Sequence, residues 1–248
     1  MRIGFLGTGH IAAPMARALT RDGHTVTVSE RNAETAAALA ASHGIAIAPN
    51  QGVLDAADVV FLTLRPGVWE DVVKDLTFRP DHRIVSAMAG PTVAQISTAT
   101  APATDISLTI PLGHIEHGGC PLPVFPATSP MAALFGDKNP VIPLEREADL
   151  TAYFSASTIL TAALSSLIAT SEWLAAETGA EGDAEAYTQA LTASYLSALP
   201  GSLAESRAGL TYPKTLNRAM LDALRDIDLE PTIKQALTDM TAAMRARP

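Results

Sequence analysis

Short apolar runs alternate with alanine-rich stretches through the first half of the chain. Five of these runs have the length and the β-branched content that strands favour: residues 2–6, 25–29, 59–64, 83–87 and 105–110. The stretches 11–20 and 33–42 between them are rich in alanine, the residue with the highest helix propensity. The alternation predicts βαβ units, and therefore a doubly wound parallel sheet with helices on both faces.

The pattern changes twice in the second half. From residue 111 to residue 143, seven prolines and four glycines break any period, which predicts a connecting region with short strands at most. After residue 145 the pattern is helical, with helices expected near 183–199 and 218–225 and an apolar stripe made of Leu160, Ala163, Leu164, Leu167, Ile168 and Leu174. We therefore expect an α/β domain over residues 1–148 and an all-helical domain over residues 149–248.

The segment 150–171 contains no charged residue and is about as long as a transmembrane helix. Nine serines and threonines interrupt it, which makes insertion into a bilayer unfavourable. We expect a helix that is buried against protein instead.

Composition favours a globular protein that acts on small molecules. Of the 248 residues 48% are hydrophobic, the formal net charge is -9, and lysines and arginines form no run. This argues against partners such as nucleic acid or an anionic membrane. The single cysteine, Cys120, cannot form an intramolecular disulfide, and the chain begins directly with a strand, so a reducing cytoplasm is the expected compartment.

A glycine motif follows the first predicted strand and opens the first predicted helix: Gly7-Thr8-Gly9-His10-Ile11-Ala12. In a dinucleotide-binding Rossmann fold, Gly7 permits the tight turn, Gly9 lets the backbone approach the pyrophosphate, and Ala12 allows close packing of helix on strand. The free N–H groups at the helix N-terminus attract the phosphates, with His10 contributing its backbone N–H. The motif predicts a nicotinamide dinucleotide site, although a tight turn without a nucleotide has the same pattern.

The end of the second strand reads Ser29-Glu30-Arg31-Asn32, where a Rossmann fold meets the adenosine ribose. Glu30 suits the free 2′-hydroxyl of NAD, whereas a hydroxyl, a guanidinium and an amide suit the 2′-phosphate of NADP. We favour NADP(H) and leave NAD open.

Three segments resemble the pyrroline-5-carboxylate reductases and their relatives in the NADP-oxidoreductase group: residues 2–12, 59–66 and 84–90. The resemblance implies that Thr63, Leu64, Arg65 and Pro66 border the nicotinamide half of the cofactor and that Ala87, Met88 and Ala89 line the reacting edge. It also implies a helical second domain that pairs with its copy, so at least a homodimer is expected.

Beyond residue 110 the resemblance weakens. The family's Met-Pro-Asn-Thr-Pro is replaced by residues 110–114, Ile-Pro-Leu-Gly-His, and its Thr-x-Pro-Gly-Gly-Thr by residues 211–216, Thr-Tyr-Pro-Lys-Thr-Leu. The changes remove groups that the family places beside cofactor and substrate. They indicate a divergent member with an altered substrate pocket.

Hydride transfer needs little acid–base chemistry from the protein beyond the handling of one proton. The candidates for proton transfer or carboxylate binding are His114, His117, Tyr212 and Lys214, with Ser165 and Ser166 on the apolar helix as hydrogen-bond donors. Zinc at His114, His117 and Cys120 is disfavoured because the segment lacks a second ligand pair.

Three functions fit the sequence. The first is an NAD(P)H-dependent reductase acting on the C=N bond of a small cyclic imine. The second is a hydroxyacid-type dehydrogenase or another redox enzyme of the same Rossmann group, including deazaflavin-dependent NADP reductases; the absence of a lysine between Lys138 and Lys214 weakens the dehydrogenase reading. The third is a non-catalytic sensor that binds the dinucleotide.

Overall fold

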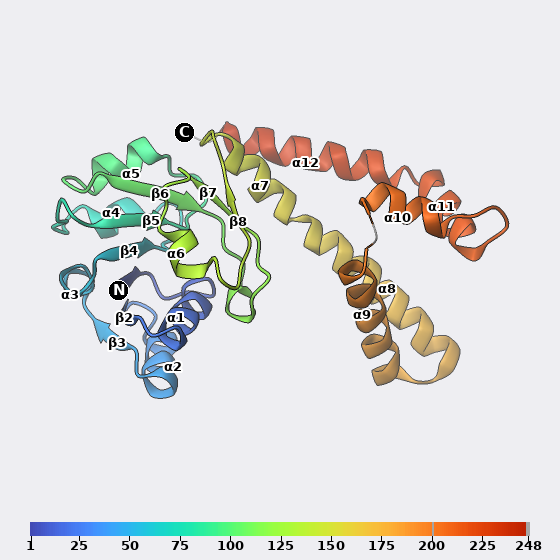
Figure 1. The fold of residues 1–248 in the computed structure, drawn as a ribbon, viewed down its shortest axis with the longest axis horizontal. Helices are drawn as coiled ribbons and strands as arrows, with labels where there is room; N and C mark the ends of the chain where they lie inside the picture. The colour runs from blue at the N-terminus through green and yellow to red at the C-terminus, as the bar shows by residue number, and fades with distance from the viewer. Residues whose placement is uncertain (200, 247–248) are drawn as a thin grey trace. The chain divides into compact units, whose positions relative to one another are not determined.

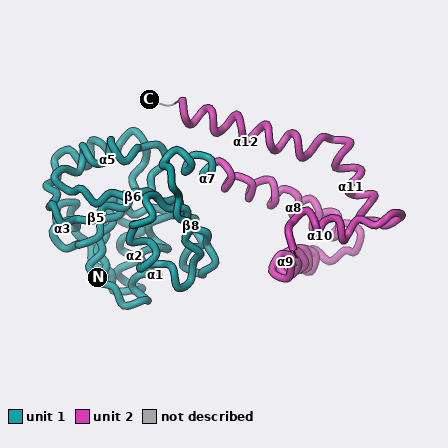
Figure 2. The backbone as a smooth tube through the Cα atoms, turned by 45° about the horizontal axis from the view of Figure 1, so that its top comes forward, with its two compact units in different colours: residues 1–154, 247–248 teal, residues 155–246 magenta. Residues whose placement is uncertain are grey.

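A computed structural model describes residues 1–199 and 201–246 (Figure 1). The described chain contains two compact units, Met1–Phe154 and Ser155–Ala246 (Figure 2). The first unit therefore extends a little beyond residue 148, the predicted end of the α/β domain. Residues 200, 247 and 248 of the predicted helical domain lie outside the described residues.

The first unit is built on one sheet with the strand order β3-β2-β1-β4-β5-β6-β7-β8. The chain runs outward from β1 in both directions, so β1 and β4 lie at the point where the strand order reverses (Figure 1). The strands are β1 Arg2–Leu6, β2 Thr25–Ser29, β3 Ala46–Ala48, β4 Val59–Leu62, β5 Arg83–Ser86, β6 Asp105–Thr109, β7 Leu122–Phe125 and β8 Val141–Pro143.

The five predicted strands are present, and the Rossmann-type fold is confirmed. The five predicted strands run parallel. Beyond them, in the region where short strands at most were expected, β7 runs antiparallel to β6 and β8 is parallel to β7. The connection from β6 to β7 holds a single 3₁₀ turn, η1 Ile115–His117, and lacks the helix that usually carries a parallel crossover. The edge strand β3 was not predicted, since three residues carry no readable alternation.

Helices cover both faces of the sheet, and each face has its own core. One face packs against α1 Ala12–Arg21, α2 Ala33–His43 and α6 Met131–Phe135, and the other against α3 Asn50–Ala56, α4 Trp69–Val73 and α5 Val93–Ala99. Gly4 of β1 is required by this packing, because a Cβ there would lie 2.7 Å from Val53 Cγ1 of α3. Stacked rings of Phe5 and Phe61 join β1 to β4 at the centre.

The second unit consists of helices, as predicted: the end of α7 Asp149–Ser157, then α8 Ile159–Thr178, α9 Glu181–Ser197, α10 Leu203–Leu210, α11 Leu216–Asp226 and α12 Leu229–Arg245. Helix α8 packs along α9, but none of its residues is buried. The expectation of a helix buried against protein is therefore wrong for α8 in a single chain. By length and composition alone, Asp149–Thr178 could also cross a membrane.

A buried histidine should make the stability of the first unit depend on pH. His82 is fully buried, its Nδ1 accepts from the Arg79 N–H, and its Nε2 lies 3.1 Å from the Leu54 carbonyl oxygen. Burial, and then the charge of Arg79, lowers the pKa of His82 below its ordinary value of 6.5. Its contribution to stability is therefore complete above pH 6.5 and is lost as pH falls toward and through the lowered pKa.

We expect the free energy of unfolding in urea to fall between about pH 7.5 and about pH 5.5. The variant His82→Gln keeps a donor for the Leu54 carbonyl, and its side chain does not titrate. Its free energy of unfolding should therefore fall less over the same pH range. Burial also lowers the pKa of His24, but His24 is present in both the wild type and the variant. The difference between the two proteins therefore reports on His82. Equal losses in the two proteins would contradict the assignment to His82.

Candidate dinucleotide site

The glycine turn lies at the carboxyl end of β1, at the point where the strand order reverses. Gly7 has φ +95°, and a Cβ there would lie 2.6 Å from the Thr63 carbonyl oxygen, so only glycine fits. The Thr63 hydroxyl donates to the carbonyl oxygens of Leu6, at 3.0 Å, and Gly7, at 2.6 Å. Thr63, predicted to border the cofactor, therefore fixes the turn to the end of β4.

Ser29 fixes the same turn from the other side. The Gly7 N–H donates to Ser29 Oγ at 2.9 Å, and Thr8 Oγ1 donates to the Ser29 carbonyl oxygen at 2.7 Å. Ser29 is fully buried and Thr8 nearly so. The expectation that the Ser29 hydroxyl wraps a 2′-phosphate needs correction, because burial and the bond from Gly7 place this hydroxyl inside the turn.

The middle of the turn has room for a ligand. A Cβ added at Gly9 would have no neighbour within 4 Å, so glycine at this position answers no packing need of the protein itself. No side chain caps the N-terminus of α1, and buried Ala12 lets the helix start close to the sheet. A surface free of side chains beside an uncapped helix N-terminus fits the pyrophosphate of a dinucleotide. His10 is exposed and Ile11 half-buried at the same edge.

Glu30, Arg31 and Asn32 follow β2 and are exposed. Asn32 caps α2 by accepting from the Thr35 N–H at 3.4 Å. Arg31 and Glu30 are therefore exposed at the end of β2, where the sequence predicts the adenosine ribose.

The ends of β4 and β5 form the other half of the edge. After β4, Leu64 is buried while Arg65 and Pro66 are exposed. After β5, Met88 is buried between half-buried Ala87 and Ala89, and its N–H donates to Ser86 Oγ. Carboxyl ends of neighbouring parallel strands are where open α/β sheets hold ligands.

His114 belongs to the loop beside the glycine turn. A Cβ added at Gly113 would lie 4.0 Å from the His10 carbonyl oxygen. The loop is held on α1 because Arg17 donates to both Glu116 oxygens, at 2.5 and 2.7 Å, and Arg21 donates to the Glu116 carbonyl. The Arg17 guanidinium keeps the pKa of the Glu116 carboxyl below its usual range.

The Arg17–Glu116 pair is a positioning feature that sequence reasoning missed. The two residues are separated by 99 positions, and no local signal connects them. His114 itself is exposed at the start of η1.

The other predicted catalytic residues lie in the second unit. The Ser166 hydroxyl is exposed and donates to the Ala162 carbonyl oxygen in its own helix. Tyr212 is exposed in the loop between α10 and α11, and Lys214 of that loop adopts φ +67°. The lysine thus keeps a left-handed backbone where the resembling family has glycine.

Within the described residues, no group of three or more His, Cys, Asp and Glu side chains is arranged to hold a metal ion. Cys120 is fully buried, and burial raises the pKa of its thiol. Its N–H donates to Asn139 Oδ1, which fixes the start of β7.

The N-terminal part of the chain is similar to a known family. Residues 2–90 match the family model described as NADP oxidoreductase, coenzyme F420-dependent. The sheet and the glycine turn define the class of fold, a Rossmann-type domain followed by a helical unit, and the match to the family model covers residues 2–90 of that domain. No curated protein matches the sequence.

Solved structures extend the likeness over the whole chain. A pyrroline-5-carboxylate reductase from Streptococcus pyogenes has a TM-score of 0.84 at 19% identity, covering 100% of this chain and 99% of that one. The Plasmodium falciparum pyrroline carboxylate reductase, solved with NADP bound, has a TM-score of 0.84 at 10% identity and coverages of 99% and 97%. An imine reductase from Pseudomonas sp. has a TM-score of 0.59 at 18% identity, with coverages of 98% and 94%.

The particular fold is therefore that of the pyrroline-5-carboxylate reductases, and the predicted resemblance is confirmed at the level of fold. The prediction of NADP as cofactor agrees with the family model matched by the N-terminal domain.

Proposed function

We propose that this protein is an NADP(H)-dependent oxidoreductase that reduces the C=N bond of a small cyclic imine. One observation carries the proposal: a glycine turn fixed from two sides leaves open space at Gly9, in a chain whose whole fold is that of pyrroline-5-carboxylate reductases. The similarity to an imine reductase supports the same bond type.

The nicotinamide supplies the hydride when the cofactor is bound. The residues of the chain hold the cofactor and the substrate in position. Gly7 and Gly9 admit the pyrophosphate, Arg31 meets the 2′-phosphate, and the ends of β4 and β5, including Arg65 and Met88, border the nicotinamide. His114 is our candidate for the proton that the reduced nitrogen takes up, with Tyr212 and Lys214 of the second unit as the alternatives. Ser166 is not included, because its hydroxyl donates to the Ala162 carbonyl oxygen.

The direct test is NADPH oxidation, followed by absorbance, with pyrroline-5-carboxylate and a panel of other cyclic imines. Turnover of any imine supports the proposal and identifies the substrate. NADPH binding without turnover on any imine would overturn the imine-reductase proposal and favour another redox substrate or a sensor. Failure to bind either nucleotide would overturn the dinucleotide site as well.

Arg31 provides a prediction about cofactor choice. The variant Arg31→Gln should bind NADPH about tenfold more weakly, because one charge-assisted contact to the phosphate is lost, while NADH binding stays unchanged. Fluorescence titration with both nucleotides measures the effect. Glu30→Gln is the matched control: it should leave NADPH binding unaffected or slightly improved. An equal loss for NADH and NADPH in Arg31→Gln would contradict the assignment.

A second candidate rests on the family model, whose description includes coenzyme F420. In that case the substrate that exchanges a hydride with NADP(H) is a deazaflavin, and no imine takes part. Reduction of F420 by NADPH, measured by loss of deazaflavin absorbance, would favour this function over the first.

We also propose that the helical unit pairs with a second copy. Leu160, Leu164 and Ile168 of α8 are spaced four residues apart and so share one helix face, and each is about half exposed. Soluble monomers rarely expose contiguous apolar surface of this kind, and a second copy with the same face would bury it.

A further inference from the structure

We propose that Arg17 and Glu116 are positioning residues, which together hold His114 beside the dinucleotide turn. The inference rests on the proposed function, in which His114 is our candidate for the proton donor. The segment concerned is the η1 loop, residues 112–118, which lies between β6 and β7 and carries His114 directly before η1.

The η1 loop has little internal structure to fix it. Its regular element is the three-residue η1, in which the His117 N–H donates to the His114 carbonyl oxygen at 2.9 Å. Gly113 and Gly118 stand on either side, and glycine leaves the backbone more freedom than any other residue. Short 3₁₀ turns have poor hydrogen-bond geometry, so the loop depends on contacts with other elements.

Two such contacts come from Ile115 and Arg21. Ile115 is 1% exposed and packs in the core on the face of the sheet that α1 covers. Arg21 of α1 donates through Nη2 to the Glu116 carbonyl oxygen at 2.7 Å. Each of these contacts fixes one point of the loop, which leaves the orientation of the loop to a third contact.

The third contact is the pair of Arg17 with the Glu116 carboxylate. Arg17 Nε donates to Oε2 at 2.5 Å and Nη2 donates to Oε1 at 2.7 Å. Two bonds from one planar guanidinium fix the orientation of the carboxylate as well as its distance. The Glu116 side chain is only 16% exposed, so water competes less for these bonds than in an exposed ion pair.

The contacts of the loop follow α1 from its N-terminal end. Gly113 lies beside the dinucleotide turn, since a Cβ there would be 4.0 Å from the His10 carbonyl oxygen. Glu116, further along the loop, is held by Arg17 in the middle of α1. His114 lies between these two fixed points. Its backbone is therefore held next to the turn that the dinucleotide occupies in the proposed function.

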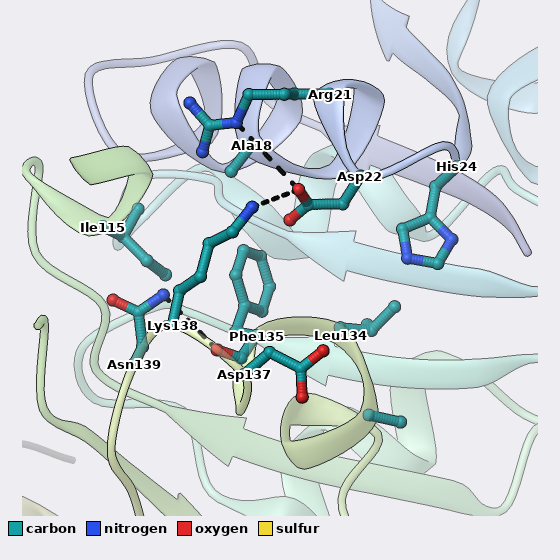
Figure 3. A pocket seen from close by; sticks show the side chains of 11 residues that line it. Ala18, Arg21, Asp22, His24, Ile115, Leu134, Phe135, Asp137, Lys138 and Asn139 are labelled. Atoms are coloured by element: carbon teal, nitrogen blue, oxygen red, sulfur yellow. Dashed lines mark hydrogen bonds and ion pairs between the residues drawn. The ribbon is translucent and has the colours of Figure 1, made fainter. Parts of the chain in front are cut away.

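The chain after the loop is fixed to the same helix. The Gly119 N–H donates to the Lys138 carbonyl oxygen at 2.8 Å, and Lys138 pairs with Asp22 at the C-terminal end of α1 (Figure 3). Helix α1 is therefore the common support of the η1 loop and of the dinucleotide turn, which precedes the first residue of the helix.

A common support matters for a proton donor, because a displacement of about 1 Å can cost about 100-fold in rate. Loss of the pair would let His114 move, while the glycine turn stays fixed by Ser29 and Thr63. The positioning role therefore predicts a fall in kcat without a matching loss of NADPH binding.

The first measurement needs no substrate. Hydrogen exchange of the loop amides, followed by NMR, should be at least about tenfold faster in Arg17→Gln than in the wild type, while the amides of β1 keep their rates. Arg83→Gln is the matched control, because it removes an arginine from an ion pair with Asp105 at the start of β5 and β6. The control should change no exchange rate in the loop.

The second measurement uses an imine that the wild type reduces. Arg17→Gln should lower kcat at least about tenfold and leave the NADPH dissociation constant within about threefold. A role in folding alone would lower the free energy of unfolding without this split. Arg17→Lys, which can pair with one carboxylate oxygen, should recover part of kcat. The double variant Arg17→Gln/Glu116→Gln should lose no more than Arg17→Gln, because the two residues act as one pair.

Three results would overturn the proposal. They are loop amides that exchange in Arg17→Gln as in the wild type, an unchanged kcat in a variant whose loop exchanges faster, and losses that add in the double variant. Failure of the proposed function gives a different result, a wild type that reduces no imine. Faster loop exchange in Arg17→Gln would then still support the pair as the contact that holds His114.

Discussion

Replacing Gly9 by valine should weaken NADPH binding at least about 100-fold and leave the fold intact. The branched side chain would occupy the space that the pyrophosphate needs, while its Cβ would have no protein atom within 4 Å. Fluorescence titration with NADPH measures the first effect. Urea unfolding measures the second and should show a free energy close to that of the wild type.

Two further glycines control this experiment. Gly182 of α9 is equally open, so Gly182→Ala should affect neither binding nor stability adversely. Gly7→Ala should weaken NADPH binding and lower the free energy of unfolding. The new Cβ would meet the Thr63 carbonyl oxygen, and the left-handed backbone would cost about 1–3 kcal/mol. If Gly9→Val binds NADPH like the wild type, the dinucleotide does not approach at this turn.

The second large effect concerns assembly. Ile168→Glu should raise the dimer dissociation constant at least about 100-fold, since the symmetry of a homodimer places two carboxylates in an apolar interface. Ile168 is 56% exposed in the single chain, so the substitution has no core to disrupt. Sedimentation velocity over a range of protein concentrations gives the constant.

Ile47→Glu is the matched control for Ile168→Glu. Ile47 is an exposed isoleucine on the edge strand β3 of the first unit, outside the helical unit. The variant Ile47→Glu should leave the dimer dissociation constant unchanged. A wild-type protein that sediments as a monomer, or an Ile168→Glu protein that dimerises like the wild type, would show that this face of α8 does not form the interface.

Local pattern was enough to predict much of the first unit. The strands at β1 and β2 have the predicted bounds, and the starts of β4, β5 and β6 are also as predicted, because alternating burial and β-branched residues act over a few neighbouring positions. Strands that depend on distant partners could not be predicted in the same way. The edge strand β3 and the reversed direction of β7 depend on partners in the sheet and on the length of a connection.

The sequence by itself determined the class of site. A glycine turn after an apolar strand leads to a dinucleotide domain because Gly7 and Gly9 act through their own backbone geometry, which needs no distant residue. Ser29 shows the limit of this reasoning. A serine hydroxyl suits a phosphate, but Ser29 lies at the buried end of β2, where its Oγ accepts from the Gly7 N–H.

Only the tertiary structure decided which side chains are already engaged and which remain for a ligand. It pairs Arg17 with Glu116 across 99 positions and so sets the loop of His114 against α1. It also pairs Lys138 with Asp22, as Figure 3 shows, although 116 positions separate them. Contacts at such separations depend on how elements pack in three dimensions, and no period or motif along the chain records them.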